Sequence, residues 1–299
     1  MDRDRLADGY VEMSDFEAVL GRLCFALGPL EYLRPFIAPL YAWAAAVGHK
    51  GRMRIPWSIA FILTYYAREF EGNGRMSKVI PLENFIGEAF RADAKAEGQC
   101  VVIGGWECLG GVPPGKARWF STRLDRKNAP WAFSRGEPFR TIAALELFAT
   151  LVSYVVFSPK WPPSTRGSVR LAGTTDNLGN TFILSRMMTS KFPALVILTE
   201  LAARLRQDNA ELQLEWAPRD QNEEADSLTN EYFGDFDLER RVLFDPLAEE
   251  WSVLDNMLKV SEEINAVVKQ RRAGSGEGGG GPPPRKRPPT EKLRVRDPW

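Results

Sequence analysis

The order of its predicted strands and helices constrains the fold of this chain more than any other sequence feature. Segments 99–107 and 117–124 are rich in β-branched and apolar residues, follow a shorter mixed segment at 85–94, and are separated by Gly/Pro-rich turns. They predict an antiparallel meander. Helical and strand patterns then alternate, with helices over 139–157, 180–188, 193–206 and 222–230 and strands over 168–174 and 211–216. This order predicts an α/β fold.

The first 70 residues predict helices instead. Ser14 and Glu17 have the spacing of a capping box, and apolar residues follow at helical spacing until Gly28-Pro29. A second helix is predicted over 35–47 and a third from Pro56-Trp57 to Tyr66.

Composition is that of an ordinary globular chain, since 44% of the 299 residues are hydrophobic and 26% are charged. The 39 basic residues balance the 39 acidic ones, so a nucleic-acid partner would have to bind a local basic patch. A helical pattern after Asp245 ends near Lys269, and the Gly/Pro-rich, locally basic segment 273–299 predicts a disordered tail.

Few residues can supply nucleophilic or zinc chemistry. The three cysteines (Cys24, Cys100 and Cys108) are scattered, and the single histidine, His49, is close to no nucleophile motif. The charged start is unlike a signal peptide, and the most apolar stretch, Ile55 to Tyr66, is too short to span a bilayer. We therefore expect an intracellular protein, cytoplasmic or nuclear, with no membrane partner. A run from Pro282 to Pro289 resembles a nuclear localisation signal, a pattern common in disordered tails.

Four carboxylates stand where an α/β sheet would bring them together. Asp93 is predicted on the first strand, Glu146 on the following helix, Asp176 at the end of the fourth strand and Asp226 near the start of the last helix. Carboxylate oxygens are the ligands that Mg²⁺ and Mn²⁺ prefer. Two such ions, roughly 3.5–4 Å apart, would clamp the attacking and leaving oxygens of a phosphoryl displacement, so this set points to phosphodiester cleavage.

The residues around these carboxylates resemble a known family. The run from Trp216 through Asn222 to Asp226-Ser-Leu-Thr is similar to the closing motif of ribonuclease H domains in retroelement reverse transcriptases. Thr175-Asp176-Asn177, Asp93-Ala94 and Ala144-Leu-Glu146-Leu are similar to the other three motifs, in the same order. Segments 20–26 and 34–43 resemble the thumb and connection segment of DIRS-like retrotransposons.

The resemblance implies a ribonuclease H-like mixed sheet flanked by helices over 84–232. A small helical thumb-like segment would precede it at 1–75, and a helical extension at 233–272 and the tail at 273–299 would follow. It implies an enzyme that uses two Mg²⁺ or Mn²⁺ ions to cleave the RNA strand of RNA:DNA hybrids.

The resemblance also assigns roles to residues. Asp93 would bridge both ions, Glu146 and Asp176 would hold the ion that activates water, and Asp226 would complete the other shell. Asn177, Asn222 and Arg219 would contact the substrate, and Asn222 would also brace the turn before Asp226. The histidine found in many members is replaced by Trp216, ten positions before Asp226.

No adjacent Asp-Asp pair occurs in the chain, so the polymerase palm that precedes the thumb in this family is missing. We therefore expect no polymerase activity from this chain alone. It would be the C-terminal part of a longer polyprotein that carries an upstream palm, or a truncated gene copy.

Other interpretations compete at several positions. Glu88, Glu97 and Glu107 are alternatives to Asp93, and packing is favoured over base stacking for Trp216 as for Trp106, Trp119 and Trp131. The basic residues Arg34, Lys50, Arg52 and Arg54 could contact phosphates or simply be solvated. For the whole chain, the alternative to an active nuclease is a non-catalytic nucleic-acid-binding remnant of a decayed retroelement.

Overall fold

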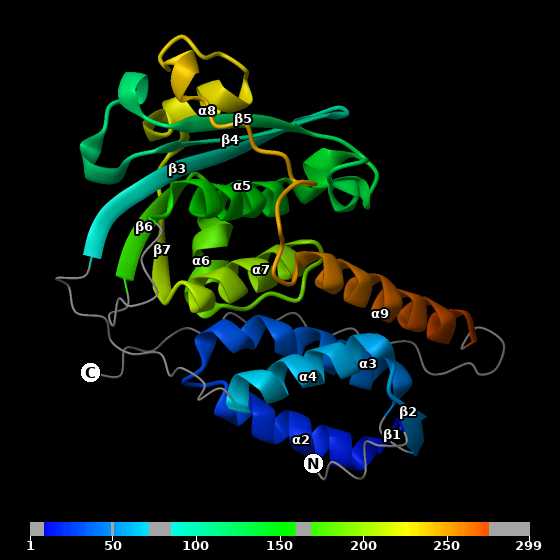
Figure 1. Cartoon of the computed structure of the whole chain (residues 1–299). Coiled ribbons are helices and arrows are strands. Elements are labelled where there is room, and N and C mark those ends of the chain that lie inside the picture. The colour runs from blue at the N-terminus through cyan, green and yellow to red at the C-terminus, as the bar shows by residue number, and fades with distance from the viewer. Residues whose placement is uncertain (1–8, 49–50, 72–84, 160–168, 275–299) are drawn as a thin grey trace, which may run out of the picture.

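The computed structural model of the chain describes residues 9–48, 51–71, 85–159 and 169–274 (Figure 1). The predictions for His49, Lys50 and the tail beyond residue 274, including the localisation-like run, lie outside the described residues.

A five-stranded mixed sheet forms the centre of the fold, with strand order β5-β4-β3-β6-β7. The three strands of the predicted meander pair antiparallel, and β6 and β7 continue the sheet parallel to β3. This confirms the expected mixed sheet. The strands are β3 (Phe85–Glu97), β4 (Cys100–Glu107), β5 (Trp119–Leu124), β6 (Val169–Thr175) and β7 (Ala210–Trp216).

Helices cover both faces of this sheet, with α5 on one face and the short α8 on the other (Figure 1). Helix α7 packs against α5, and helix α6 packs against β7. A separate small apolar cluster under α8 contains Trp106, Trp119 and Leu228. The helices are α5 (Ile142–Phe157), α6 (Leu178–Arg186), α7 (Ala194–Gln207) and α8 (Glu223–Thr229).

Short 3-10 helices connect these elements. They are η3 (Leu109–Gly111), η4 (Pro114–Lys116), η5 (Pro130–Phe133), η6 (Pro138–Thr141), η7 (Arg219–Gln221) and η8 (Leu238–Arg240).

The most apolar helical segment is Pro138–Phe157, and not the Ile55 to Tyr66 stretch that the sequence analysis singled out. It is long and apolar enough to cross a membrane by length and composition, but 67% of it is buried inside the protein. The helix is apolar on all sides because it lies between the sheet and α7.

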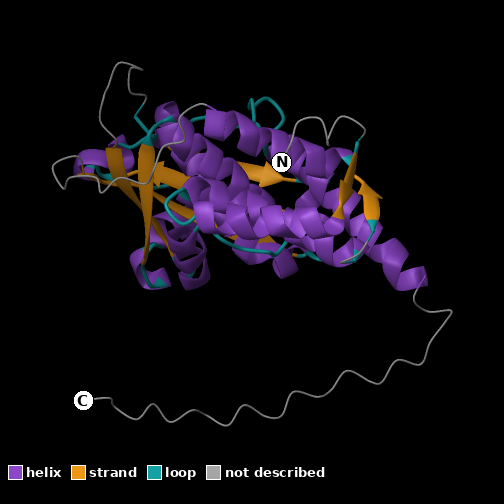
Figure 2. Ribbon diagram, turned by 90° about the horizontal axis from the view of Figure 1, so that it is seen from below, coloured by secondary structure: helices purple, strands orange, loops and turns teal. Residues whose placement is uncertain are grey.

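The N-terminal helices pack as a layer beneath the α7 side of the sheet domain, as the view from that side shows (Figure 2). They are α2 (Met13–Ala26), η1 (Glu31–Phe36), α3 (Ile37–Val47) and α4 (Trp57–Glu71). All three predicted helices are confirmed. A two-stranded sheet of β1 (Tyr10–Glu12) and β2 (Arg52–Arg54) is an element that the sequence analysis missed.

The predicted capping box at Ser14 is wrong, because the N-cap residue of α2 is Glu12, two residues earlier. Pairing of Glu12 with Arg52 keeps residue 12 extended, and the Met13 amide donates to the Gly51 carbonyl (3.0 Å). The strand pairing thus fixes where the helix begins, and Ser14 falls inside its first turn.

Helix α9 (Leu254–Gly274) joins the N-terminal layer to the sheet domain, since it packs against α3, α4 and α7. The buried Glu200 of α7 accepts hydrogen bonds from the backbone amides of Val253 (2.7 Å) and Leu254 (2.9 Å) at the start of α9. Glu263 of α9 in turn accepts from the Ser58 amide in the first turn of α4 (2.9 Å). Two buried or half-buried carboxylates therefore satisfy amides at two helix starts.

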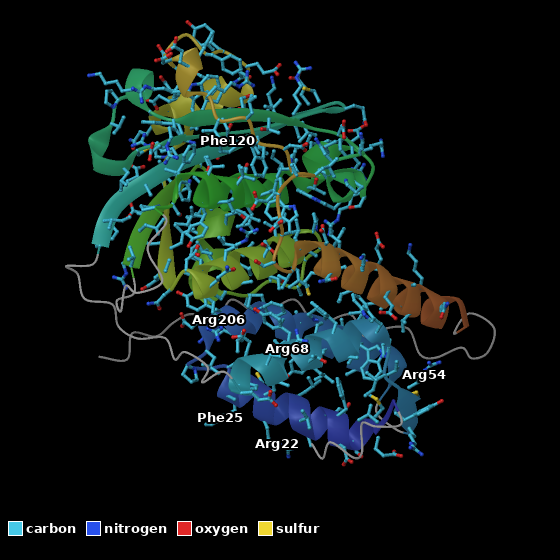
Figure 3. All side chains as sticks on the ribbon, in the orientation of Figure 1. Arg22, Phe25, Arg54, Arg68, Phe120 and Arg206 are labelled. Carbon is cyan, nitrogen blue, oxygen red and sulfur yellow. The ribbon has the colours of Figure 1, made fainter. Side chains whose placement is uncertain are left out.

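An ion pair and an apolar core also cross this boundary. Arg206 of α7 pairs with Glu69 of α4, and Figure 3 shows Arg206 where α7 faces the N-terminal helices. One continuous cluster of buried residues runs from Phe16 and Trp43 in the N-terminal layer to Leu198 in α7 and Met257 in α9. The division into four segments remains a prediction.

Candidate active site

The candidate site lies where two neighbouring parallel strands separate. β3 and β6 pair as far as Arg91 and Thr174. Asp93 and Asp176 each lie two residues beyond that last pair. Side chains at the carboxyl ends of diverging strands face a shared opening, which is where open α/β sheets bind their ligands.

Asp93 is only 7% exposed and accepts a hydrogen bond from the Thr229 hydroxyl (2.7 Å). Burial, together with the negative charges of Asp176 and Asp226, raises the pKa of Asp93 to about 6 against the opposing effect of the Thr229 hydrogen bond. Asp93 is therefore a buried acid that faces other acids.

The three acidic residues that competed with Asp93 in the sequence have a different environment. Each forms an ion pair with a basic neighbour: Glu88 with Arg91 (2.9 Å), Glu97 with Lys95 (3.0 Å) and Glu107 with Arg118 (2.7 Å). Their charges are compensated within the protein, which leaves Asp93 as the strand carboxylate of the site.

Glu146 reaches the same place from α5 and is almost fully buried. Burial raises the pKa of Glu146 to about 8, with added repulsion from Asp176 and Asp93 and a smaller opposing effect of a hydrogen bond with Asn177. Its Oε2 atom is buried with no hydrogen-bond partner among the described residues. A buried carboxyl oxygen without a partner is costly, because it has lost its water and gained nothing in exchange.

Asp176 follows β6 directly and, like Glu146, has a carboxylate oxygen that is buried without a hydrogen-bond partner in the described part of the chain. Its Oδ1 atom is buried without a partner among the residues that the structure describes. Burial raises the pKa of Asp176, the positive charge of Arg219 lowers it, and the charge of Asp226 raises it.

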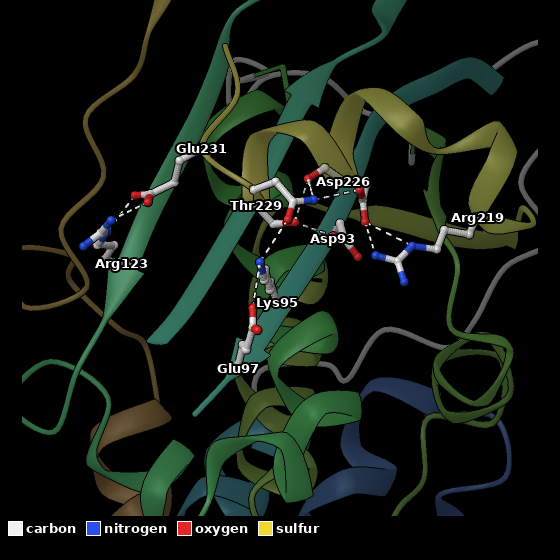
Figure 4. A network of polar contacts seen from close by, with 9 residues as sticks. Asp93, Lys95, Glu97, Arg123, Arg219, Asp226, Thr229 and Glu231 are labelled. Atoms are coloured by element: carbon white, nitrogen blue, oxygen red, sulfur yellow. Dashed lines mark hydrogen bonds and ion pairs between the residues drawn. The ribbon is translucent and has the colours of Figure 1, made fainter. Parts of the chain in front are cut away.

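Asp226 comes from α8 and is held by two neighbours (Figure 4). Arg219 donates to the Oδ1 atom of Asp226 from both Nε (3.1 Å) and Nη2, and the side-chain amide of Asn230 donates to Oδ2 (2.7 Å). The guanidinium of Arg219 also interacts with the charges of Asp93 and Asp176. Arg219 is thus the one cation that the described residues bring into contact with this set of carboxylates.

A glycine lets α8 approach the sheet closely enough to place Asp226. Gly104 is the cross-strand partner of Asp93, and a Cβ atom on it would lie 2.9 Å from the Leu228 Cβ. Because this position has no side chain, α8 lies directly on β4 and brings Thr229 to Asp93.

The donor set fits a divalent cation in chemical type. It consists of oxygens only, it concentrates negative charge, and two of its buried oxygens have no protein partner. Among residues 9–48, 51–71, 85–159 and 169–274, however, no three His, Cys, Asp or Glu side chains are arranged closely enough to hold a metal ion. The contacts of Asp226 with Arg219 and Asn230 occupy the oxygens that such an ion would need.

The two asparagines have structural roles in this conformation. Asn222 is 1% exposed, and its amide donates to the Ala92 carbonyl (3.3 Å), so it braces the start of α8 against β3. Its burial leaves no surface for a substrate. Asn177 is the N-cap residue of α6, where its side chain accepts from the Asn180 amide (3.2 Å), and it also bonds to Glu146.

Three contributing residues were missed in the sequence. Thr229 lies three residues after Asp226, one helical turn away, so the helix spacing alone could have placed both on one face. Lys95 lies two residues after Asp93 on the same strand, and its Nζ donates to Asn230 (3.0 Å). Asn230 gave no sequence signal, because its role depends on where α8 ends.

Trp216 corrects an expectation. Trp106, Trp119 and Trp131 are buried and pack in the core as favoured, but Trp216 is 50% exposed. Its Nε1 donates to the Asp176 carbonyl (3.0 Å), so the indole lies beside the carboxylates instead of in the core. Packing was the wrong interpretation because β7 ends at Trp216, and half of the side chain stays exposed there.

Solved structures of two ribonuclease H proteins resemble the chain. Ribonuclease H1 of the halophilic archaeon Halobacterium salinarum is 17% identical, with a TM-score of 0.32, over 50% of this chain and 98% of that one. The N-terminal ribonuclease H domain of a Mycobacterium tuberculosis protein, solved as a fusion with maltose-binding protein, is 19% identical, with a TM-score of 0.31, over 50% and 94% of the two chains. No protein-family model and no curated protein matches the chain.

Proposed function

We propose that this protein is a metal-dependent nuclease that hydrolyses the RNA strand of RNA:DNA hybrids. The observation that carries the proposal is the convergence of four carboxylates from four separate segments, Asp93, Glu146, Asp176 and Asp226, each electrostatically coupled to at least one of the others. Uncompensated clusters of buried acids destabilise a fold, so a bound cation is the simplest reason for the arrangement.

The four carboxylates would hold Mg²⁺ or Mn²⁺, with two ions as the proposed number. When bound, the metal supplies an activated water and stabilises the charge that develops on the phosphate oxygens. The protein's own residues position the ligands: Thr229 orients Asp93, Asn177 orients Glu146, and Asn230 orients Asp226. Arg219, three-quarters exposed, is free to exchange Asp226 for a substrate phosphate.

The N-terminal layer is proposed to contact the nucleic-acid backbone, as the thumb-like resemblance implies. Both arginines of β2 are exposed; the Arg52 guanidinium lies over the Tyr10 ring (5.3 Å to its centroid), and Arg54 is available for phosphates. Arg34 is not, because its guanidinium donates to the Leu27 carbonyl (3.1 Å) and pairs with Glu31. The origin in a DIRS-like reverse transcriptase and the link to an upstream polymerase palm belong to the same proposal.

One observation favours the alternative, a nucleic-acid-binding remnant without activity. The carboxylates as they stand are not close enough together to ligate an ion, and Arg219 compensates Asp226 instead. In that case the site would bind hybrids but cleave none.

Labelled RNA:DNA, RNA:RNA and DNA:DNA duplexes of one sequence, incubated with Mg²⁺ or with EDTA, separate these functions. The proposal predicts cleavage of the RNA strand in the hybrid, in Mg²⁺ only. Binding of the hybrid without cleavage in Mg²⁺ or Mn²⁺ would establish the remnant instead.

A further inference from the structure

Trp216 is the last residue of β7 and lies at the edge of the carboxylate site. The hydrogen bond from its Nε1 to the Asp176 carbonyl fixes one edge of the indole beside the site. Half of the side chain is exposed, and no aromatic ring among the described residues stacks on it. With its only polar atom already bonded, the indole presents an apolar surface to whatever binds there.

Two further apolar side chains are exposed on α6, the helix that packs against β7. Leu178 begins that helix two residues after Asp176, and Phe182 lies one turn further on the same face. Leu178 is 51% exposed and Phe182 53% exposed. We call Trp216, Leu178 and Phe182 the apolar platform.

One arginine lies beside Phe182 and another beside the carboxylates. The Arg186 guanidinium is 6.0 Å from the Phe182 ring centroid, and Arg219 lies beside the carboxylates. Exposed aromatic surface flanked by arginines is the pattern that binds single-stranded nucleic acid, because bases stack on the rings while phosphates meet the cations.

We infer that the apolar platform binds unpaired nucleotides that adjoin the hybrid, and that the preferred substrate is therefore a hybrid with a single-stranded extension. This inference rests on the proposed function. Inside a continuous duplex both faces of every base are covered by neighbouring bases, so a base can stack on Trp216 only where pairing ends. A surface for a continuous duplex would instead present cations to the phosphates along its whole length.

Fluorescence anisotropy in EDTA, which prevents cleavage, tests the inference. The probes are a blunt RNA:DNA hybrid and the same hybrid with short unpaired extensions. Wild-type protein should bind the extended hybrid roughly tenfold more tightly than the blunt one. Trp216→Ala should reduce the ratio of the two affinities, extended over blunt, to about one while affinity for the blunt hybrid stays unchanged. Trp216→Phe should restore most of this preference.

Two further variants keep the result interpretable. Phe182→Ala, outside the carboxylate site, should reduce the ratio even if Trp216→Ala fails to fold. Phe25→Ala removes an exposed aromatic ring on α2 and should leave the ratio unchanged. Equal binding of both probes by wild-type protein would overturn the inference, as would an undiminished ratio in both Trp216→Ala and Phe182→Ala. If wild-type protein bound neither hybrid, the proposed function would be overturned as well.

Discussion

Asp93 and Glu146 are carboxyl groups that keep a proton at pH values where surface acids have lost theirs. Burial is the largest cause for both, and the neighbouring carboxylates add to it. In the folded protein the pKa of Glu146 is about 8, against 4.5 for the ordinary group. The folded state therefore binds more protons than the unfolded state between these values, so stability falls as pH rises through them.

Glu146→Gln removes this pH dependence because the amide is neutral at every pH. In EDTA, the free energy of unfolding of the wild type should fall by roughly 1–3 kcal/mol between pH 5 and about pH 8, and the variant should lose much less. Urea unfolding followed by circular dichroism measures both, with the exposed Glu137→Gln as the control. A wild type that is more stable at pH 8 than at pH 5 would show that Glu146 is not a buried, protonated acid.

Arg219 competes for the carboxylate that a cation would bind. Arg219→Gln frees Asp226 from its guanidinium partner, so the affinity for Mn²⁺ should rise by about two- to fivefold, as expected for loss of a mostly exposed ion pair of up to about 1 kcal/mol. Calorimetric titration with Mn²⁺ measures the change. Weaker Mn²⁺ binding by the variant would mean that Arg219 organises the site instead of competing for it.

Sequence patterns located all four carboxylates, because each lies within a segment whose type could be assigned. They could not show the contacts of each carboxylate: the competing acids Glu88, Glu97 and Glu107 have ion-pair partners, whereas Asp93 is buried beside other acids. Those partners depend on strand register and on how α8 sits on Gly104, and neither follows from local sequence.

Among the elements, α9 depends on one carboxylate of α7. Glu200 is fully buried, accepts amides from the start of α9, and pairs with Arg204 (2.7 Å). The sequence predicted a helix over 193–206 but did not single out Glu200. Its partners are some fifty residues away in the sequence, so no local pattern could identify it.

Glu200→Gln should destabilise the protein by about 2–4 kcal/mol, because a neutral amide cannot accept from the helix amides and from Arg204 as a carboxylate does. Urea unfolding measures the loss, and hydrogen exchange should show faster opening of α9 than of the sheet. The matched control is Glu262→Gln, an exposed position on α9. Equal stability of the two variants would contradict the role of Glu200.

For the whole molecule, the order of strands and helices along the chain was predictable because each of them carries its own periodicity. The packing of the N-terminal helices, α9 and α7 into one core was not predictable, since it depends on contacts between segments distant in the sequence. The proposed nuclease site lies at the end of the sheet where β3, β6, α5 and α8 meet.

Cleavage of the RNA strand in a labelled hybrid by the full chain, by Asp176→Asn and by the exposed-acid control Asp235→Asn tests this account most directly. We predict Mg²⁺-dependent cleavage by the full chain and by Asp235→Asn, and a loss of at least about a hundredfold in Asp176→Asn, because a carboxylate that would hold a catalytic ion is gone. Equal cleavage by Asp176→Asn, or cleavage by the wild type in EDTA, would contradict it.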